Sequence, residues 1–313
     1  MLSSALADAM SLRRDLLADA DECVRVLAGA GDGAPGVIVD RFGRFAVATV
    51  YDPGLAGDAP ALGASVSEAL GGAPVLVRAR EDDGFSVSWS AGPEARPDSF
   101  VSTEAGLRFE VRADPRHDFG LYLDGRAARA WVRAGAGGAR VLNLFAYTCG
   151  FGVAAAAGGA AGVTNVDPSR DYLTWGRRNA ALNGFDFRVI PDTAQAYLAR
   201  LVRRMGRGAE AGVDILVVDP PAFGVGRGDA RVLRKAWPDI LDATRAIAPG
   251  RAVMCCNDRW LRERRDFAGM VGDGLGSGWD VSVLPQDLTA TGADPEARDP
   301  WYLPPVVVIA RRL

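Results

Sequence analysis

Short apolar runs alternate with helical stretches from residue 140 to the end of the chain. The runs are VLNLF, VTNVD, FRVIPD, DILVVD, RAVMCC, WDVSVLP and PPVVVIARRL. Strands that are apolar along their whole length are buried on both faces, which is typical of a mostly parallel sheet covered by helices. Residues 285–304 are rich in Pro, Asp and Gly and leave no room for a crossover helix. We therefore expect an α/β fold with a seven-stranded, Rossmann-like sheet, in which the last strand is antiparallel and inserted between its predecessors.

The first third of the chain has a different pattern. The runs GVIVD and FAVATVYD flank a tight turn at residues 41–44, and PVLVRARE, FSVSWS and LRFEVRA follow. The first 23 residues read as a short amphipathic helix rather than a signal peptide, and the polar stretch 90–99 reads as a linker or a long loop. Residues 115–132 end in a helical run. These patterns predict a smaller α+β domain at residues 1–112 and a second domain at residues 113–313.

Composition narrows the functional classes. The chain has 313 residues, a net charge of −3 and a single lysine, and a pI near 5.4. It lacks the basic balance of a dedicated nucleic-acid binder, so contact with a polyanion would need a local patch. One patch is formed by Arg200, Arg203, Arg204 and Arg207, and its simpler interpretation is a solvated helix face. No apolar run is long enough to span a bilayer.

Four cysteines and one histidine are present, and none of the cysteines forms a CxxC pair. A structural zinc site cannot be assembled from them, so we expect no metal. We expect reduced thiols and a cytoplasmic protein.

The turn after the first strand of the second domain predicts a ligand site. That strand covers 141–145, and the turn contains Gly150 and Gly152, which let a ligand approach the backbone closely. The next two strands end in Asp167 and Asp192, suited to ribose hydroxyls and an adenine amino group. The turn has no GxGxxG spacing and no basic residue for phosphate. This favours S-adenosylmethionine, and the alternative is a bare α/β fold whose acids serve only as caps.

The fourth strand ends in Asp219, Pro220, Pro221, Ala222 and Phe223. The prolines stiffen the chain, Asp219 can accept a hydrogen bond from an amino group, and Phe223 can stack on a flat ring. The fifth strand ends in Cys255 and Cys256. Either cysteine could attack a pyrimidine as a nucleophile, or both could be small buried apolar residues.

Five segments resemble one family. They are GDGAPGVIVDRFGRFAV (31–47), FGLYLDGRAAR (119–129), VLNLFAYTCGFGVAAAAGG (141–159), NVDPSRDYLTWGRRNAALNG (165–184) and VVDPPAFG (217–224). Together they resemble the class I S-adenosylmethionine-dependent methyltransferases of 23S ribosomal RNA, whose members methylate C5 of cytosine or N7 of guanine.

The resemblance implies roles for individual residues. It implies substrate contacts near Pro220, Pro221 and Phe223. It places Asp124 and Arg126 beside the cofactor pocket. It implies cofactor contacts near Asn143, Phe145, Tyr147, Gly150, Asp167, Asp192 and Asp219.

The chain departs from the family in several places. It has Cys149 where relatives have glycine. Asp118-Phe119 stands where relatives have a Lys or Thr before a Gly-x-Phe-Leu-Asp motif. We expect no N-terminal PUA-type RNA-binding domain. The first hypothesis is methylation of an RNA base, with 23S rRNA as partner. The alternatives are a small-molecule methyltransferase of the same fold and a binding protein without catalysis. The pattern predicts neither the methylated atom nor the oligomeric state.

Overall fold

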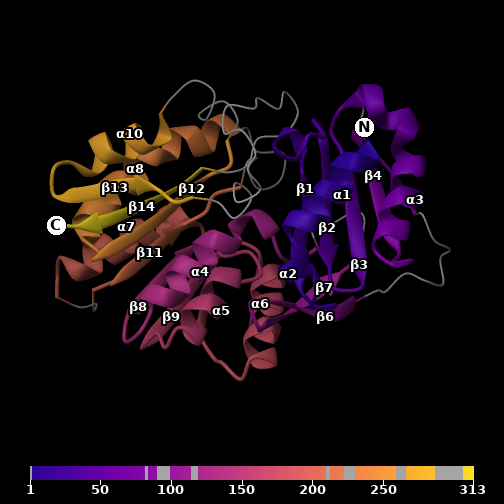
Figure 1. Cartoon of the computed structure of the whole chain (residues 1–313). Helices are drawn as coiled ribbons and strands as arrows, with labels where there is room; N and C mark the ends of the chain where they lie inside the picture. Colours follow the sequence, from indigo (N-terminus) through magenta and orange to yellow (C-terminus); the bar gives the residue numbers. More distant parts are fainter. Residues whose placement is uncertain are drawn as a thin grey trace. The chain divides into compact units, whose positions relative to one another are not determined.

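The computed structural model describes residues 2–81, 84–89, 99–113, 119–208, 212–221, 230–258, 266–285 and 306–313. They form two compact units, one within residues 2–126 and the other within residues 127–285 and 306–313 (Figure 1). No helix among the described residues is long and apolar enough to cross a membrane.

The N-terminal unit is built on a five-stranded sheet with the order β1-β2-β3-β4-β5. Its strands are β1 (Cys23–Ala28), β2 (Val37–Phe42), β3 (Phe45–Val50), β4 (Val75–Glu81) and β5 (Gly84–Trp89), and a separate hairpin pairs β6 (Ser99–Glu104) with β7 (Leu107–Arg112). Its helices are α1 (Leu2–Leu12), α2 (Arg14–Leu17) and α3 (Ala59–Ala69).

The predicted hairpin is confirmed, because β2 and β3 are antiparallel with Phe42 opposite Phe45. The predicted N-terminal helix is confirmed as α1, which buries Leu6 against the sheet. The α3 helix connects β3 to β4, and these two strands are parallel. Strands β1 and β6 and helix α3 were not predicted. The stretch 90–98, read as a linker or loop, lies outside the described residues.

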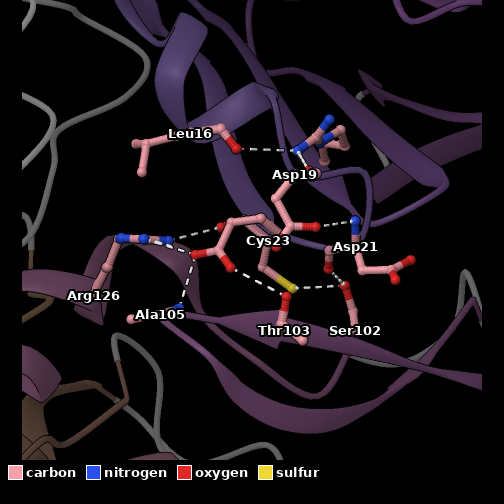
Figure 2. Close-up of polar contacts among 10 residues, drawn as sticks. Leu16, Asp19, Asp21, Cys23, Ser102, Thr103, Ala105 and Arg126 are labelled. Carbon is pink, nitrogen blue, oxygen red and sulfur yellow. Dashed lines mark hydrogen bonds and ion pairs between the residues drawn. The ribbon is translucent and has the colours of Figure 1, made fainter.

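Buried charged side chains connect the elements of this unit through hydrogen bonds and ion pairs (Figure 2). Arg41 donates to the carbonyl oxygens of Leu17 and Asp19 at 3.1 and 2.6 Å, at the end of α2. Glu22 lies 2.7 Å from Arg126 and accepts from the Ala105 backbone N–H at 2.8 Å. Since a buried charge is costly without partners, these contacts specify how β1, the β6–β7 hairpin and the 119–126 segment pack.

The second unit contains a seven-stranded sheet with the order β10-β9-β8-β11-β12-β14-β13. Its strands are β8 (Arg140–Leu144), β9 (Gly162–Asp167), β10 (Arg188–Pro191), β11 (Ile215–Val218), β12 (Arg251–Cys256), β13 (Trp279–Val283) and β14 (Val306–Arg312). Its helices are α4 (Arg126–Gly135), α5 (Gly150–Ala157), α6 (Arg170–Leu182), α7 (Ala194–Met205), α8 (Ala230–Ile247) and α10 (Phe267–Leu275). The predicted α/β architecture is confirmed, and so is the insertion of the last strand, because β14 is antiparallel to both β12 and β13.

Helices cover both faces of this sheet. Alternate residues of a strand point to opposite faces, and Leu142, Leu144 and Val166 pack with α7, α8 and α10 in one core. Asn165 points to the other face, where it lies against Gly152 of α5. The central strands β8, β11, β12 and β14 are therefore buried on both sides, as their continuous apolar runs predicted, whereas the edge strands β10 and β13 are more exposed.

The strand register brings the predicted site residues to one edge. Leu144 at the end of β8 lies opposite Val166 of β9 and Val218 of β11 in parallel pairing. Asp167 and Asp219 are the next residues along β9 and after β11. Both acids therefore lie at the carboxyl edge of the sheet, on either side of the β8 end, where open α/β sheets bind ligands.

Candidate active site

The loop that follows β8 has an unusual backbone. Phe145, Tyr147 and Cys149 all have left-handed φ angles, 57°, 47° and 62°. Each such non-glycine residue costs about 1–3 kcal/mol and persists only where surrounding contacts hold it. The Ala146 N–H donates to the Val166 carbonyl at 3.0 Å, and Asn179 donates to the Thr148 carbonyl at 3.0 Å. The predicted strand end at Phe145 is one residue too long, because this residue already turns into the loop.

Asp167 holds the loop after β8 through hydrogen bonds to its backbone. Its two carboxylate oxygens accept from the Tyr147 backbone N–H at 2.9 Å and from the Ser169 backbone N–H at 2.8 Å. Burial raises the pKa of the Asp167 carboxyl above its ordinary value, and the two backbone donors offset part of this shift. Each carboxylate oxygen keeps a second acceptor site, so Asp167 can shape the loop and still accept ligand hydroxyls.

A pair of buried amides lies behind the loop. Asn143 donates to Asn165 at 2.8 Å, and both side chains are almost fully buried. A Cβ on Gly152 would come within 2.3 Å of Asn165 Oδ1, so this glycine lets α5 approach the sheet. Gly150 is the first residue of α5. Asn143 is thus held in a buried amide pair with Asn165, and its predicted contact with a cofactor stays a prediction.

Asp192 follows β10 at the same edge. Its backbone N–H donates to the Asp167 carbonyl at 3.1 Å, and its carboxylate accepts from the backbone N–H of Thr193 at 2.9 Å and from Arg200. Thr193 caps α7 by accepting from the Ala196 N–H. Asp192 therefore lies beside Asp167, as its strand-end position predicted.

Asp219 and Pro220 are held by a residue that the sequence analysis did not assign. The Asn257 carboxamide, just after β12, donates to Asp219 Oδ1 and to the Pro220 carbonyl, both at 3.0 Å. Pro221 is exposed, and Phe223 lies outside the described residues. Asn257 was missed because its role depends on β11 and β12 being neighbours, which no local motif reveals.

Cys255 and Cys256 are buried within β12, with exposed fractions of 3% and 1%. Cys256 packs in the core with α8 and α10. All four cysteines are free thiols. These positions favour the interpretation that both residues are small apolar side chains.

Aromatic rings border the loop on the side of α6. The Tyr147 ring lies 4.6 Å from that of Tyr172 in an edge-on contact and 6.4 Å from that of Trp175. Ser169 caps α6 by accepting from the Tyr172 N–H. Tyr172 and Trp175 were not assigned a role, although both stand inside the segment NVDPSRDYLTWGRRNAALNG.

Asp124 belongs to the N-terminal unit. It lies 3.7 Å from Arg25, which in turn makes a two-pronged contact with Asp40 at 2.7 and 3.0 Å. Arg126 donates to the Cys23 carbonyl at 3.0 Å. Within their unit, Asp124 and Arg126 are thus fixed by ion pairs, and their place beside a cofactor stays a prediction.

A family of S-adenosylmethionine-dependent methyltransferases matches residues 56–264. The chain is 31% identical over 284 residues to ribosomal RNA large subunit methyltransferase I of Cronobacter sakazakii, covering 87% of this chain and 71% of the relative. It is 30% identical to the protein of the same name from Klebsiella pneumoniae, with coverage of 87% and 70%.

Solved structures are similar in fold. One, described as a methyltransferase complexed with SAH, superimposes with a TM-score of 0.80 at 19% identity, over 99% of this chain and 80% of that one. The S-adenosylmethionine-dependent methyltransferase of Agrobacterium tumefaciens gives a TM-score of 0.63 at 20% identity, over 93% and 89%.

Proposed function

The chain belongs to the S-adenosylmethionine-dependent methyltransferase family, and from this premise we propose that it methylates a base of large-subunit ribosomal RNA. The substrate follows from relatives that are about 30% identical along most of their length. The observation that carries the site is the meeting of Asp167 and Asp219 at the carboxyl edge of the sheet, on either side of the β8 loop.

The described residues fit the cofactor chemically. An adenosine presents hydroxyl and amino donors, and Asp167 and Asp192 offer carboxylate acceptors side by side. No lysine or arginine stands in the loop from Phe145 to Gly150, which disfavours a phosphate in that place. Asp167 would accept from the ribose, Asp192 from the adenine amino group, and Phe145, Tyr147 and Gly150 would line the pocket. We also propose that Asn143 and Asp124 contribute to cofactor binding.

Asp219, Pro220, Pro221 and Phe223 form the proposed acceptor side. Asn257 holds Asp219 Oδ1, and we assign the Asp219 carboxylate the role of accepting from an amino group of the target base and orienting it. The prolines restrict the backbone beneath the base, and we assign Phe223 a stacking role. When bound, S-adenosylmethionine supplies an electrophilic methyl group. The protein contributes by holding the acceptor atom in line, because positioning alone can supply a large part of the rate.

The proposed domain boundary lies at residue 113, ahead of the 119–126 segment, whereas the first compact unit extends to Arg126. We propose that residues 113–313 form a class I, Rossmann-like methyltransferase domain and that residues 1–112 form a smaller α+β domain, on which the 119–126 segment packs. We propose a cytoplasmic location, where ribosomal RNA is available.

Two measurements test this function. Calorimetric titration with S-adenosylmethionine should show binding, and Asp167→Ala should weaken it strongly; unchanged affinity would refute the cofactor site. Mass mapping of ribosomal RNA from a deletion strain should reveal one missing methyl group. If binding is retained but the map is unchanged, the acceptor is a small molecule, an alternative that the acidic pI favours.

A further inference from the structure

The exposed side of α7 carries an unusual concentration of positive charge. Arg200, Arg203 and Arg204 lie on one face of α7, and Arg207 follows in the turn after the helix, one residue past Gly206. All four are exposed. We call this set the α7 arginine face. The helix itself contains no acidic residue, whereas α6 and α8 mix arginines with aspartates.

Helix stability accounts for only part of this arrangement. Basic residues in the last turn interact favourably with the helix dipole, by about 0.3–1 kcal/mol each. Like charges three and four residues apart oppose this by about 0.2–0.5 kcal/mol per pair. Arg200 pairs with Asp192 near the start of α7. Arg203, Arg204 and Arg207 concentrate three arginines at the end of α7 and in the turn after it, in a chain whose net charge is −3.

A groove adjoins this face. It has a volume of about 370 Å³ and lies at the amino edge of the sheet, opposite the carboxyl edge that carries the proposed active site. Its lining includes Arg140, Arg188, Phe187, Tyr197 and Leu201. We call it the amino-edge groove.

The groove and the α7 arginine face share a border. Tyr197 lines the groove, and the Arg200 guanidinium lies 5.9 Å from the centre of its ring. Arg140 is held by Asp214 at 3.0 and 3.1 Å, and Asp186 also lines the groove beside Arg188. The groove is thus nearly neutral and partly aromatic, while the strong positive charge lies on the helix next to it.

A single strand of nucleic acid matches both surfaces, because its bases are flat and neutral and its phosphates form a negatively charged row. Proteins bind single-stranded nucleic acid with aromatic side chains under the bases and arginines along the backbone. The α7 helix has 12 residues and is therefore about 18 Å long, and it leads from Asp192 at the proposed active edge to the groove. A nucleic-acid strand lying along α7 would connect the carboxyl edge of the sheet with its amino edge.

We propose that the α7 arginine face and the amino-edge groove bind a single-stranded segment of the RNA substrate away from the methylated base. This assignment rests on the proposed function. Arg203, Arg204 and Arg207 contact phosphates, and a base enters the groove against Tyr197. The surface adds affinity and register, and the chemistry stays at the carboxyl edge.

The test compares two triple variants of the full chain. In the first, Arg203, Arg204 and Arg207 are replaced by Gln. In the control, Arg245, Arg311 and Arg312 are replaced by Gln, which removes the same charge from exposed positions on α8 and β14. Binding to a large-subunit ribosomal RNA fragment is measured from low to high salt, with S-adenosylmethionine affinity as a check of folding.

We expect the α7 variant to lower the slope of log K against log salt by about 2, because each single-strand phosphate contact contributes about 0.7. The control should keep the wild-type slope. Tyr197→Leu should weaken binding about 5- to 150-fold with an unchanged slope, since it removes stacking and no charge. Equal weakening by both triple variants would overturn this assignment and leave the proposed function intact. Failure of the wild-type protein to bind the RNA would instead overturn the proposed function.

Discussion

Replacing Asn257 tests whether the Asp219-Pro220 segment must be held for catalysis. Asn257→Ala removes two hydrogen bonds of 3.0 Å, one to a carboxylate and one to a carbonyl. A hydrogen bond to a charged group contributes about 1.5–3 kcal/mol and one between neutral groups about 0.5–1.5 kcal/mol. Because both are only partly buried, we take about 2–3 kcal/mol as their combined effect, which lowers kcat about 30- to 150-fold if it acts on the transition state.

The assay is transfer of a labelled methyl group to the RNA fragment, with the affinity for S-adenosylmethionine measured in parallel. We expect kcat to fall while cofactor affinity and the thermal unfolding midpoint stay close to wild type. Such a split separates a positioning role from a general loss of stability.

Asn257→Asp sharpens the test through pH. The introduced carboxyl would lie about 3 Å from Asp219, and two carboxylates at that distance raise one pKa strongly. At low pH the introduced carboxyl is protonated and can donate to Asp219 as the amide does, so turnover should recover as pH falls. Asn257→Ala should show no such recovery. If Asn257→Ala retains full kcat, or if the two variants share one pH profile, the positioning role is wrong.

Three further predictions concern the β8 loop and its supports. Burial raises the pKa of Asp167 in the folded protein, so its contribution to stability is present at low pH and is lost as pH rises through the folded pKa; the free energy of unfolding of wild type relative to Asp167→Asn, from denaturant titrations, should therefore fall with rising pH, and a flat difference would contradict it. Gly152→Ala should destabilise by about 1–3 kcal/mol because its Cβ would overlap the amide behind it, whereas Gly162→Ala, which has open space, should leave the unfolding midpoint nearly unchanged. Gly176→Ala would bring a Cβ within 2.3 Å of Cys149 Sγ, so it should destabilise wild type but be tolerated together with Cys149→Gly; additive effects in that double-mutant cycle would refute the contact.

The sequence predicted the second unit better than the first, for a physical reason. The strands of the seven-stranded sheet are continuous apolar runs, so each can be recognised from local sequence. The missing crossover helix was enough to predict that β14 is antiparallel. Strand β1 was missed because Arg25 interrupts its apolar pattern. That arginine is accommodated by Asp40 on the neighbouring strand, a partner that only the fold reveals.

The candidate site likewise contains residues that the sequence could place and residues that it could not. Asp167, Asp192 and Asp219 could be placed from sequence because strand ends in a parallel sheet share an edge. Asn257 could not be placed in this way, because its role depends on the segment after β12 lying close to the segment after β11. The left-handed conformation of Phe145 and Tyr147 was equally hidden, since neither is glycine.

The left-handed residues of the loop argue that this site is formed before any ligand arrives. Three such residues would not persist in a free loop. Here the Ala146 N–H is bound to β9, the Tyr147 N–H is bound to Asp167, and Gly176 leaves room for the Cys149 side chain. The carboxylate that we propose as the ribose acceptor is therefore also the one that fixes the loop. A ligand meeting such a loop loses little free energy to ordering it, so Asp167 should influence cofactor affinity twice, through its own contact and through the backbone shape that it maintains.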